Sequence, residues 1–154
     1  MNRNSIIIAR DLIRIARMLV ADDASAYTDK ELLDFIKLMI SRNDKWAVRA
    51  LERIYDGQQD DEKETGETSH LNGIGFNGYD AGFLTGIYKS YVQHGGTLTQ
   101  KQMDSLRRIM PKYAGQIMRS RYFDREKCCK IYAEYLERKN NKTASWIEEV
   151  EPCY

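Results

Sequence analysis

The sequence predicts an all-α protein, a single compact domain over residues 1–154 with about six or seven short helices and an irregular glycine-rich middle loop. The length of 154 residues suits one domain, and 42% hydrophobic with 31% charged residues is typical of a folded, soluble chain. Apolar residues recur at the 3.6-residue period of a helix in most segments, and helix-start signals precede several of them. No segment has a convincing strand pattern.

Residues 1–42 are predicted to form an N-terminal pair of helices. The first lies in the stretch SIIIARDLIRIARMLVA, whose arginines occupy a face away from its apolar residues. The second begins at Thr28, which forms a capping box with Glu31 in which each side chain satisfies a free backbone N–H. The apolar faces are Ile8, Leu12, Ile15, Ala16 and Leu19 in the first helix, and Leu32, Phe35, Ile36 and Met39 in the second.

A third helix is expected over residues 41–57, with Asn43 as its cap and Gly57 near its end. Its buried side chains are expected to be Trp46, Ala47, Ala50, Leu51 and Ile54. These three helices could form a small bundle, and an acidic linker over residues 56–70 would follow it.

A helix over residues 80–96 would start at Asp80 as its cap and break at the glycine pair that ends it. The next helix, over residues 98–110, has the best start signal, because Thr99 and Gln102 form a capping box. Leu98 and Met103 stand at the two positions of a hydrophobic staple.

Two further helices complete the expected set. Pro111 suits the first turn of a helix over residues 111–120, and the last long helix covers residues 124–141. The side chains expected to be buried are Phe83, Leu84, Ile87, Tyr88 and Tyr91 in the helix over residues 80–96, and Cys128, Ile131, Tyr132, Tyr135 and Leu136 in the last helix.

The glycines of GIGFNG, Gly73, Gly75 and Gly78, have the G-x-G-x-x-G spacing of a dinucleotide-binding loop. A phosphate-binding loop follows a buried strand, whereas the residues before this one, DDEKETGETSHLN, are polar and acidic. We therefore expect no nucleotide and no other cofactor. The glycines would instead permit positive φ or close backbone approach, and Phe76 would anchor the loop to the core.

The cysteines and histidines do not have the spacing of a metal site, and we expect no bound metal. Cys128 and Cys129 are adjacent and Cys153 stands near the end, a pattern that indicates reduced thiols in a cytosol, that of a bacterial host. His70 and His94 stand alone. Arginines and an aspartate interrupt the apolar N-terminal stretch, which argues against a membrane span.

Charge is segregated along the chain although the net charge is only +1. Residues 56–67 hold six acids against one lysine, whereas residues 98–142 hold twelve bases against five acids, a net charge of +7. Such runs are usually solvated helix faces, but a basic surface also suits nucleic acid or an acidic partner.

Residues 43–119 resemble a small helical module of tailed phages and mobile elements, which includes the accessory protein encoded beside the UvsW recombination helicase of T-even phages. The resemblance rests on scattered positions: Trp46, Tyr55, Gln58, Glu62, Lys63, Asn72, Gly73, Gly75, Phe76, Asp80, Ala81, Leu98, Gln102, Met103, Pro111, Lys112 and Tyr113. It implies an all-helical domain associated with DNA-processing proteins. The helical pair before residue 43, and a C-terminal helix and acidic tail over residues 120–154, lie outside the module.

Catalysis is not expected, because isolated histidines and cysteines on an apolar face supply no activated nucleophile. Two non-catalytic functions remain. The first is a phage or mobile-element accessory protein that binds single-stranded nucleic acid, or a DNA-processing protein, through the basic C-terminal half. The second is a phage-encoded inhibitor or regulator that binds a host defence protein, in the manner of an anti-CRISPR protein, or a replication protein.

The candidate binding residues follow from the first function. Bases would contact phosphates, and a tyrosine, Tyr113 or Tyr122, would stack on unpaired bases. The predicted nucleic-acid or partner-binding residues are Arg107, Arg108, Lys112, Tyr113, Arg119 and Arg121.

Overall fold

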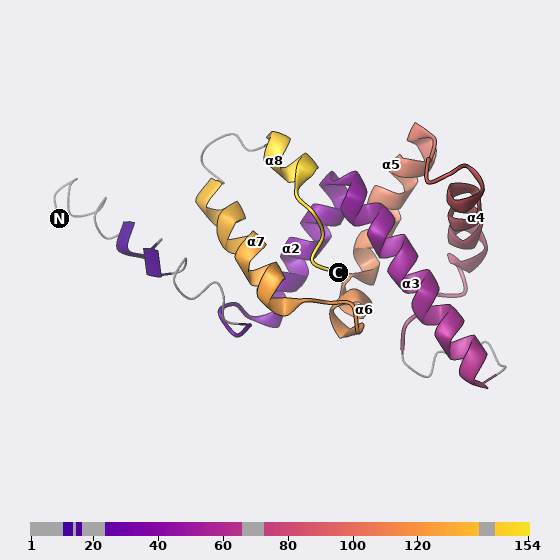
Figure 1. Ribbon diagram of the computed structural model, residues 1–154, viewed down its shortest axis with the longest axis horizontal. Coiled ribbons are helices and arrows are strands. Elements are labelled where there is room, and N and C mark those ends of the chain that lie inside the picture. Colours follow the sequence, from indigo (N-terminus) through magenta and orange to yellow (C-terminus); the bar gives the residue numbers. More distant parts are fainter. Residues whose placement is uncertain (1–10, 14, 17–23, 66–72, 139–143) are drawn as a thin grey trace.

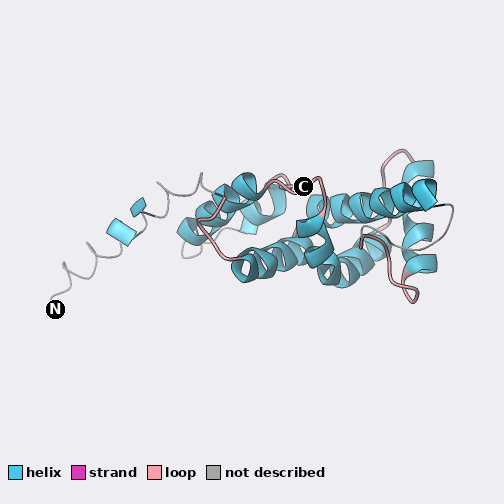
Figure 2. Cartoon of the chain, turned by 90° about the horizontal axis from the view of Figure 1, so that it is seen from below, coloured by secondary structure: helices cyan, strands magenta, loops and turns pink. Residues whose placement is uncertain are grey.

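The computed structural model describes residues 11–13, 15–16, 24–65, 73–138 and 144–154. Every regular element within these residues is helical, which confirms the predicted all-α class (Figures 1 and 2). Residues 11–13 and 15–16 are helical, and the elements that follow in this part of the chain are α2 (Asp29–Arg42), α3 (Asp44–Thr65), α4 (Ala81–Gln93), α5 (Gln100–Ile109), a 3₁₀ turn η1 (Met110–Tyr113), α6 (Ala114–Arg119), α7 (Arg125–Arg138) and α8 (Ala144–Glu149).

Helices α2 and α3 form the centre of the fold. Helix α2 packs against α3, η1, α6 and α7, while α3 also packs against α4 and α5. Figure 1 shows α7 and α8 on one side of this central pair and α4 and α5 on the other. The apolar faces predicted for α2 and α3 are all buried, because the 3.6-residue period places them on the contact between the two helices.

The first predicted helix does not bury the face that its pattern suggested. Leu12 and Ile15 are 62% and 48% exposed, so the expected packing of this face in a three-helix bundle is wrong for both residues. Two further positions of the predicted face, Ile8 and Leu19, lie outside the described residues.

Helix α3 continues beyond its predicted end near Gly57 to Thr65, so residues 56–65, predicted as a linker, are helical. A single glycine costs a helix only about 1 kcal/mol, and the following glutamine, glutamate and lysine residues favour helix. Gly57 is buried, and a Cβ at this position would clash with the side chain of Ile74. The glycine therefore allows the loop after α3 to pack against the helix.

The C-terminal residues are part of the core, contrary to the predicted acidic tail. Helix α8 was not predicted, and beyond it Cys153 and Tyr154 are 1% and 4% exposed. The main-chain N–H of Asp124, just before α7, donates to the Cys153 carbonyl at 2.8 Å. Burial of these apolar side chains favours the packed position, and the three nearby glutamates remain exposed and therefore solvated.

The start of α3 holds this C-terminal segment through polar contacts. The Asn43 amide donates to the carbonyls of Ile147 and Val150 at 2.7 and 3.0 Å, and the Trp46 indole donates to Val150 at 2.9 Å. The Tyr154 hydroxyl donates to the Trp46 carbonyl at 2.8 Å. The segment is thus hydrogen-bonded to residues about 100 positions earlier in the chain.

The elements around α4 and α5 agree with the prediction in part. The capping box of Thr99 and Gln102 is present, with hydrogen bonds of 3.1 and 3.0 Å. Phe83 is 52% exposed and not buried, because Leu84 and Ile87 define the inner face of α4 and Phe83 lies at its edge. Pro111 lies in the first turn of the 3₁₀ element η1, so the single helix predicted over residues 111–120 is η1 followed by α6.

Candidate functional site

Two of the predicted basic contacts are paired with carboxylates inside the protein. The Arg107 guanidinium binds Asp44 at 3.0 Å and also contacts Asp104, and only 29% of its side chain is exposed. Lys112 forms an ion pair with the buried carboxylate of Asp80. These two bases are therefore less available to phosphates than their place in a basic segment suggested.

Tyr113 is a core residue, which corrects its predicted role as a stacking surface. Only 2% of it is exposed, and its ring packs edge-to-face on Phe76, with centroids 5.9 Å apart. The hydroxyl donates to Asp80 at 2.8 Å and accepts the main-chain N–H of Asn77 at 3.0 Å. Burial, together with the nearby Asp80 carboxylate, raises the pKa of Tyr113 to about 12.

Asp80 stands at the N-cap position of α4, but its side chain makes no cap hydrogen bond. Its prediction as a side-chain cap is wrong, since the carboxylate instead faces Tyr113 and Lys112. Burial alone would raise the pKa of Asp80, but the hydrogen bonds and the positive charge from these two residues outweigh it and lower the pKa. The group is thus a buried anion that joins α4 to η1.

The loop before α4 is held by side chains that bind its backbone. The N–H of Gly75 donates to Gln116 at 2.8 Å, and the N–H of Phe76 donates to Gln58 at 3.0 Å. Tyr113 accepts the N–H of Asn77 and the Asn77 side chain accepts the N–H of Asp80, so four main-chain donors of this segment are not available to a phosphate.

The glycines of this loop have different backbone conformations. Of the two roles predicted for these glycines, positive φ or close backbone approach, Gly73 has the first, with a φ of 71°, whereas Gly75 and Gly78 do not have a positive φ. Gly75 is buried, and its main-chain N–H is held by a side chain of α6.

The turn between α6 and α7 brings two guanidinium groups to one tyrosine ring. The guanidinium carbons of Arg53 and Arg121 lie 4.0 and 4.9 Å from the centroid of the Tyr122 ring, and Arg121 also donates to the Tyr122 hydroxyl at 2.8 Å. We call these three residues the arginine–tyrosine cluster. Such contacts are attractive because the ring face carries negative charge.

Arg119 and Arg108 complete the predicted set. Both are exposed, and neither makes an ion pair with another residue of the described part of the chain. Arg53, by contrast, was missed by the sequence analysis, because it lies on α3 before the acidic stretch and far from the basic segment. The signal that could have found Arg53 is its spacing of four residues from Arg49, which places both arginines on one face of a helix.

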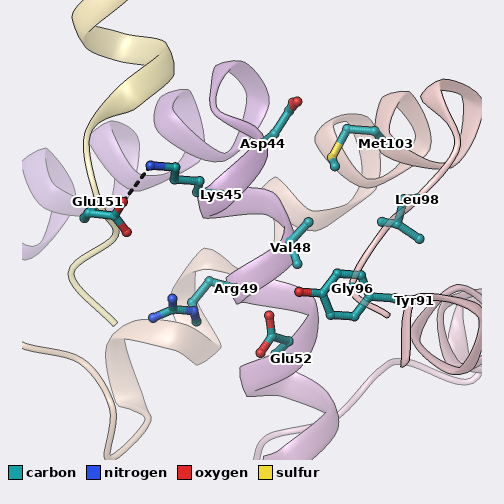
Figure 3. Close-up of a pocket in the computed structure, with 10 residues that line it drawn as sticks. All are labelled: Asp44, Lys45, Val48, Arg49, Glu52, Tyr91, Gly96, Leu98, Met103 and Glu151. Atoms are coloured by element: carbon teal, nitrogen blue, oxygen red, sulfur yellow. Dashed lines mark hydrogen bonds and ion pairs between the residues drawn. The ribbon is translucent and has the colours of Figure 1, made fainter. Parts of the chain in front are cut away.

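A pocket of about 320 Å³ lies between α3, the connection from α4 to α5, and the C-terminal segment (Figure 3). Its residues are Asp44, Lys45, Val48, Arg49, Glu52, Tyr91, Gly96, Leu98, Met103 and Glu151. Figure 3 shows the Tyr91 ring reaching from α4 toward Glu52 and Arg49 on α3. The staple residues Leu98 and Met103 form part of its apolar wall, so the predicted staple contributes to a concave surface.

Comparisons with known protein families, with curated proteins and with solved structures found no match to this chain. The resemblance to the phage module therefore stays a prediction. Several residues that carry it, Gln58, Phe76, Asp80 and Tyr113, hold the loop before α4 in place.

None of the helices that the structure describes is both long enough and apolar enough to cross a membrane. Within the same residues, no group of three histidine, cysteine, aspartate or glutamate side chains comes together to hold a metal ion.

Proposed function

We propose that the protein is a non-catalytic accessory protein, of the phage or mobile-element type that the sequence suggests, which binds single-stranded nucleic acid at the arginine–tyrosine cluster. The observation that carries this proposal is the contact of two guanidinium groups with the half-buried Tyr122 ring. Proteins that bind single strands combine cations for the backbone with flat side chains on which bases stack. The cluster offers both where α3 passes the turn between α6 and α7.

The bases around the cluster strengthen the proposal. Arg119 is the last residue of α6 and lies two residues before Arg121. One nucleic-acid strand could therefore bind Arg119 through a phosphate while a neighbouring base stacks at the cluster. Arginine suits this role because its planar fork binds phosphate and also stacks on bases. Arg108, on α5, is exposed and is a further candidate for a phosphate contact.

A salt titration with a fluorescent oligothymidylate tests the proposal. Each phosphate contact contributes about 0.7 to the slope of log affinity against log salt for single strands, so Arg119→Glu with Arg121→Glu should flatten the slope by about 1.4. Tyr122→Ala should weaken binding by about 1–3 kcal/mol if a base stacks there. Arg42→Glu, an exposed arginine at the end of α2, is the matched control and should leave binding unchanged.

Tyr113→Ala separates a binding effect from a folding effect. Because this ring is buried, its removal should lower the free energy of unfolding by about 3–5 kcal/mol.

Absence of oligonucleotide binding by the intact protein at low salt would refute the nucleic-acid proposal.

A second candidate, a protein-binding regulator of a host defence or replication protein, is favoured by one observation. Tyr79, in the turn before α4, is 95% exposed, and Phe83, in the first turn of α4, is 52% exposed. Exposed aromatic pairs are typical of protein interfaces. Tyr79→Ala with Phe83→Ala should then abolish capture of one defined host protein from nuclease-treated lysate, while Val92→Ala, also on α4, should not.

A further inference from the structure

The pocket between α3, the connection from α4 to α5, and the C-terminal segment has an apolar wall and a polar one. Val48, Leu98 and Met103 form the apolar wall. The volume of about 320 Å³ lies at the lower end of the range, roughly 300–1,000 Å³, in which proteins bind small molecules. A ligand of this pocket should therefore be small and should carry an apolar group beside its polar ones.

Four charged side chains at the pocket are paired within the protein or belong to such a pair. Asp44 pairs with Arg107, which lies outside the pocket, at 3.0 Å, and Lys45 pairs with Glu151 at 2.6 Å. Each pair is neutral as a whole, so these side chains make the pocket neither acidic nor basic. The charges that decide which ligand fits are those that remain.

Arg49 and Glu52 are the two remaining charged residues of the pocket. They lie three positions apart on α3, so they are neighbours on one face of the helix. Figure 3 draws no ion pair between them, and the Arg49 guanidinium donates to the Tyr154 carbonyl at 3.3 Å. A guanidinium has several N–H donors and a carboxylate accepts several hydrogen bonds, so each group can also bind a ligand.

The ring of Tyr91 closes the pocket beside these two charges. The main-chain N–H of Gly96 donates to the Tyr91 carbonyl at 2.8 Å, and the positive φ of Gly96, 89°, turns the chain back along the ring. Burial raises the pKa of Tyr91, the negative charge of Glu52 raises it further, and the positive charge of Arg49 opposes this. The hydroxyl is therefore neutral at pH 7 and can hydrogen-bond to a charged ligand.

We infer that this pocket binds a free α-amino acid with an aliphatic side chain. The Arg49 guanidinium binds the carboxylate of the ligand, and the Glu52 carboxylate binds its ammonium group. Both charges of an α-amino acid are attached to one carbon atom, so two neighbouring side chains of opposite sign can reach them together. Val48 precedes Glu52 by four positions on the same face of α3, which places the aliphatic side chain of the ligand over the apolar wall.

This inference does not rest on the proposed nucleic-acid function. The pocket contains no residue of the arginine–tyrosine cluster, so amino-acid binding and oligonucleotide binding can each be present or absent without the other.

Four small molecules test the charges and the apolar group separately. L-leucine carries all three groups, whereas 4-methylpentanoate lacks the ammonium group, 3-methylbutylamine lacks the carboxylate and glycine lacks the side chain. In ¹H–¹⁵N NMR titrations of the full chain, L-leucine should give saturable shifts at the main-chain N–H groups of Val48, Glu52 and Leu98. Each of the other three molecules should bind at least about tenfold more weakly, because each loses a charged hydrogen bond or the apolar contact.

Two substitutions assign the charges to their side chains. Glu52→Gln should abolish the preference for L-leucine over 4-methylpentanoate, and Arg49→Gln should abolish the preference for L-leucine over 3-methylbutylamine. Glu137→Gln, at an exposed glutamate of α7 outside the pocket, is the matched control and should bind L-leucine like wild type. Thermal unfolding shows whether each variant keeps its fold. Because Arg49 also contacts Tyr154, the Glu52→Gln result decides if the Arg49 variant unfolds.

Three results would each overturn the inference. The first is the absence of a saturable shift at millimolar L-leucine, or shifts that map outside the pocket. The second is binding of 4-methylpentanoate or 3-methylbutylamine to wild type as tightly as L-leucine, because the pocket would then recognise a single charge. The third is binding of glycine as tightly as L-leucine, which would exclude the apolar wall from the site.

Discussion

Replacing Asn43 with alanine should lower the free energy of unfolding by about 2–4 kcal/mol. Asn43 is 1% exposed and acts at two places at once. Its side-chain oxygen accepts the N–H groups of Lys45 and Trp46 at the start of α3, at 2.9 and 3.2 Å. Its amide nitrogen donates to the Ile147 and Val150 carbonyls at 2.7 and 3.0 Å.

The magnitude follows from these contacts. Loss of an N-cap costs about 1 kcal/mol. The Ile147 carbonyl loses its donor from Asn43, which costs about 1–3 kcal/mol for a buried group. Val150 loses less, because its carbonyl keeps the Trp46 indole donor at 2.9 Å. For a domain of this size the total corresponds to a fall in Tm on the order of 10 °C.

Urea unfolding followed by tryptophan fluorescence measures the effect, and a second variant divides it into parts. Asn43→Ser keeps a side-chain oxygen that can cap α3 but is too short to donate to the two carbonyls, so it should retain the cap and still lose the contact to the C-terminal segment. Asn43→Ala should then be less stable than Asn43→Ser by about 1 kcal/mol. If Asn43→Ala unfolds within about 0.5 kcal/mol of wild type, the assigned role of this residue is wrong.

Three further outcomes are expected. Thr99→Ala should cost about 1 kcal/mol of stability in the same assay, and no change would contradict the capping role. Gly57→Ala should destabilise the fold by about 1–3 kcal/mol despite the better helix propensity of alanine, because its Cβ would clash with the buried Ile74; a gain in stability would refute this. The lowered pKa of Asp80 stabilises the fold above the ordinary aspartate pKa, and this contribution is lost as pH falls through the lowered value. Lys112→Met should therefore reduce stability at pH 7 but not at pH 2, as thermal unfolding would show; an equal loss at both would exclude the ion pair as the cause.

The helices that the sequence predicted well are those whose signals are local. In α2 and α5, a capping box and the 3.6-residue period lie within one segment, so the start and the buried face follow from neighbouring residues. Helix α8 has only six residues, too few for a periodic pattern, and its place depends on Asn43, 104 positions away from Ile147. Contacts of that separation have no local signal.

The candidate site was predicted less well for the same reason. A charge count shows that residues 98–142 are basic, but it cannot show that Arg107 meets Asp44, 63 positions earlier, or that Tyr113 meets Asp80. A tyrosine has an apolar body and a polar tip, so its type alone does not separate a core position from a stacking surface. Arg53 reaches Tyr122 only because α3 passes the turn after α6.

The C-terminal segment also has a consequence for how quickly the protein can fold. Trp46 and Asn43 leave the ribosome early, yet their hydrogen-bond partners are synthesised about 100 residues later, with separations of 104 to 108. Until residues 147–154 arrive, the start of α3 exposes an indole ring and an unpaired amide to solvent. Closing so long a loop is entropically unfavourable and slows folding. The contacts that hold the start of α3 can therefore form only after the rest of the domain has been synthesised.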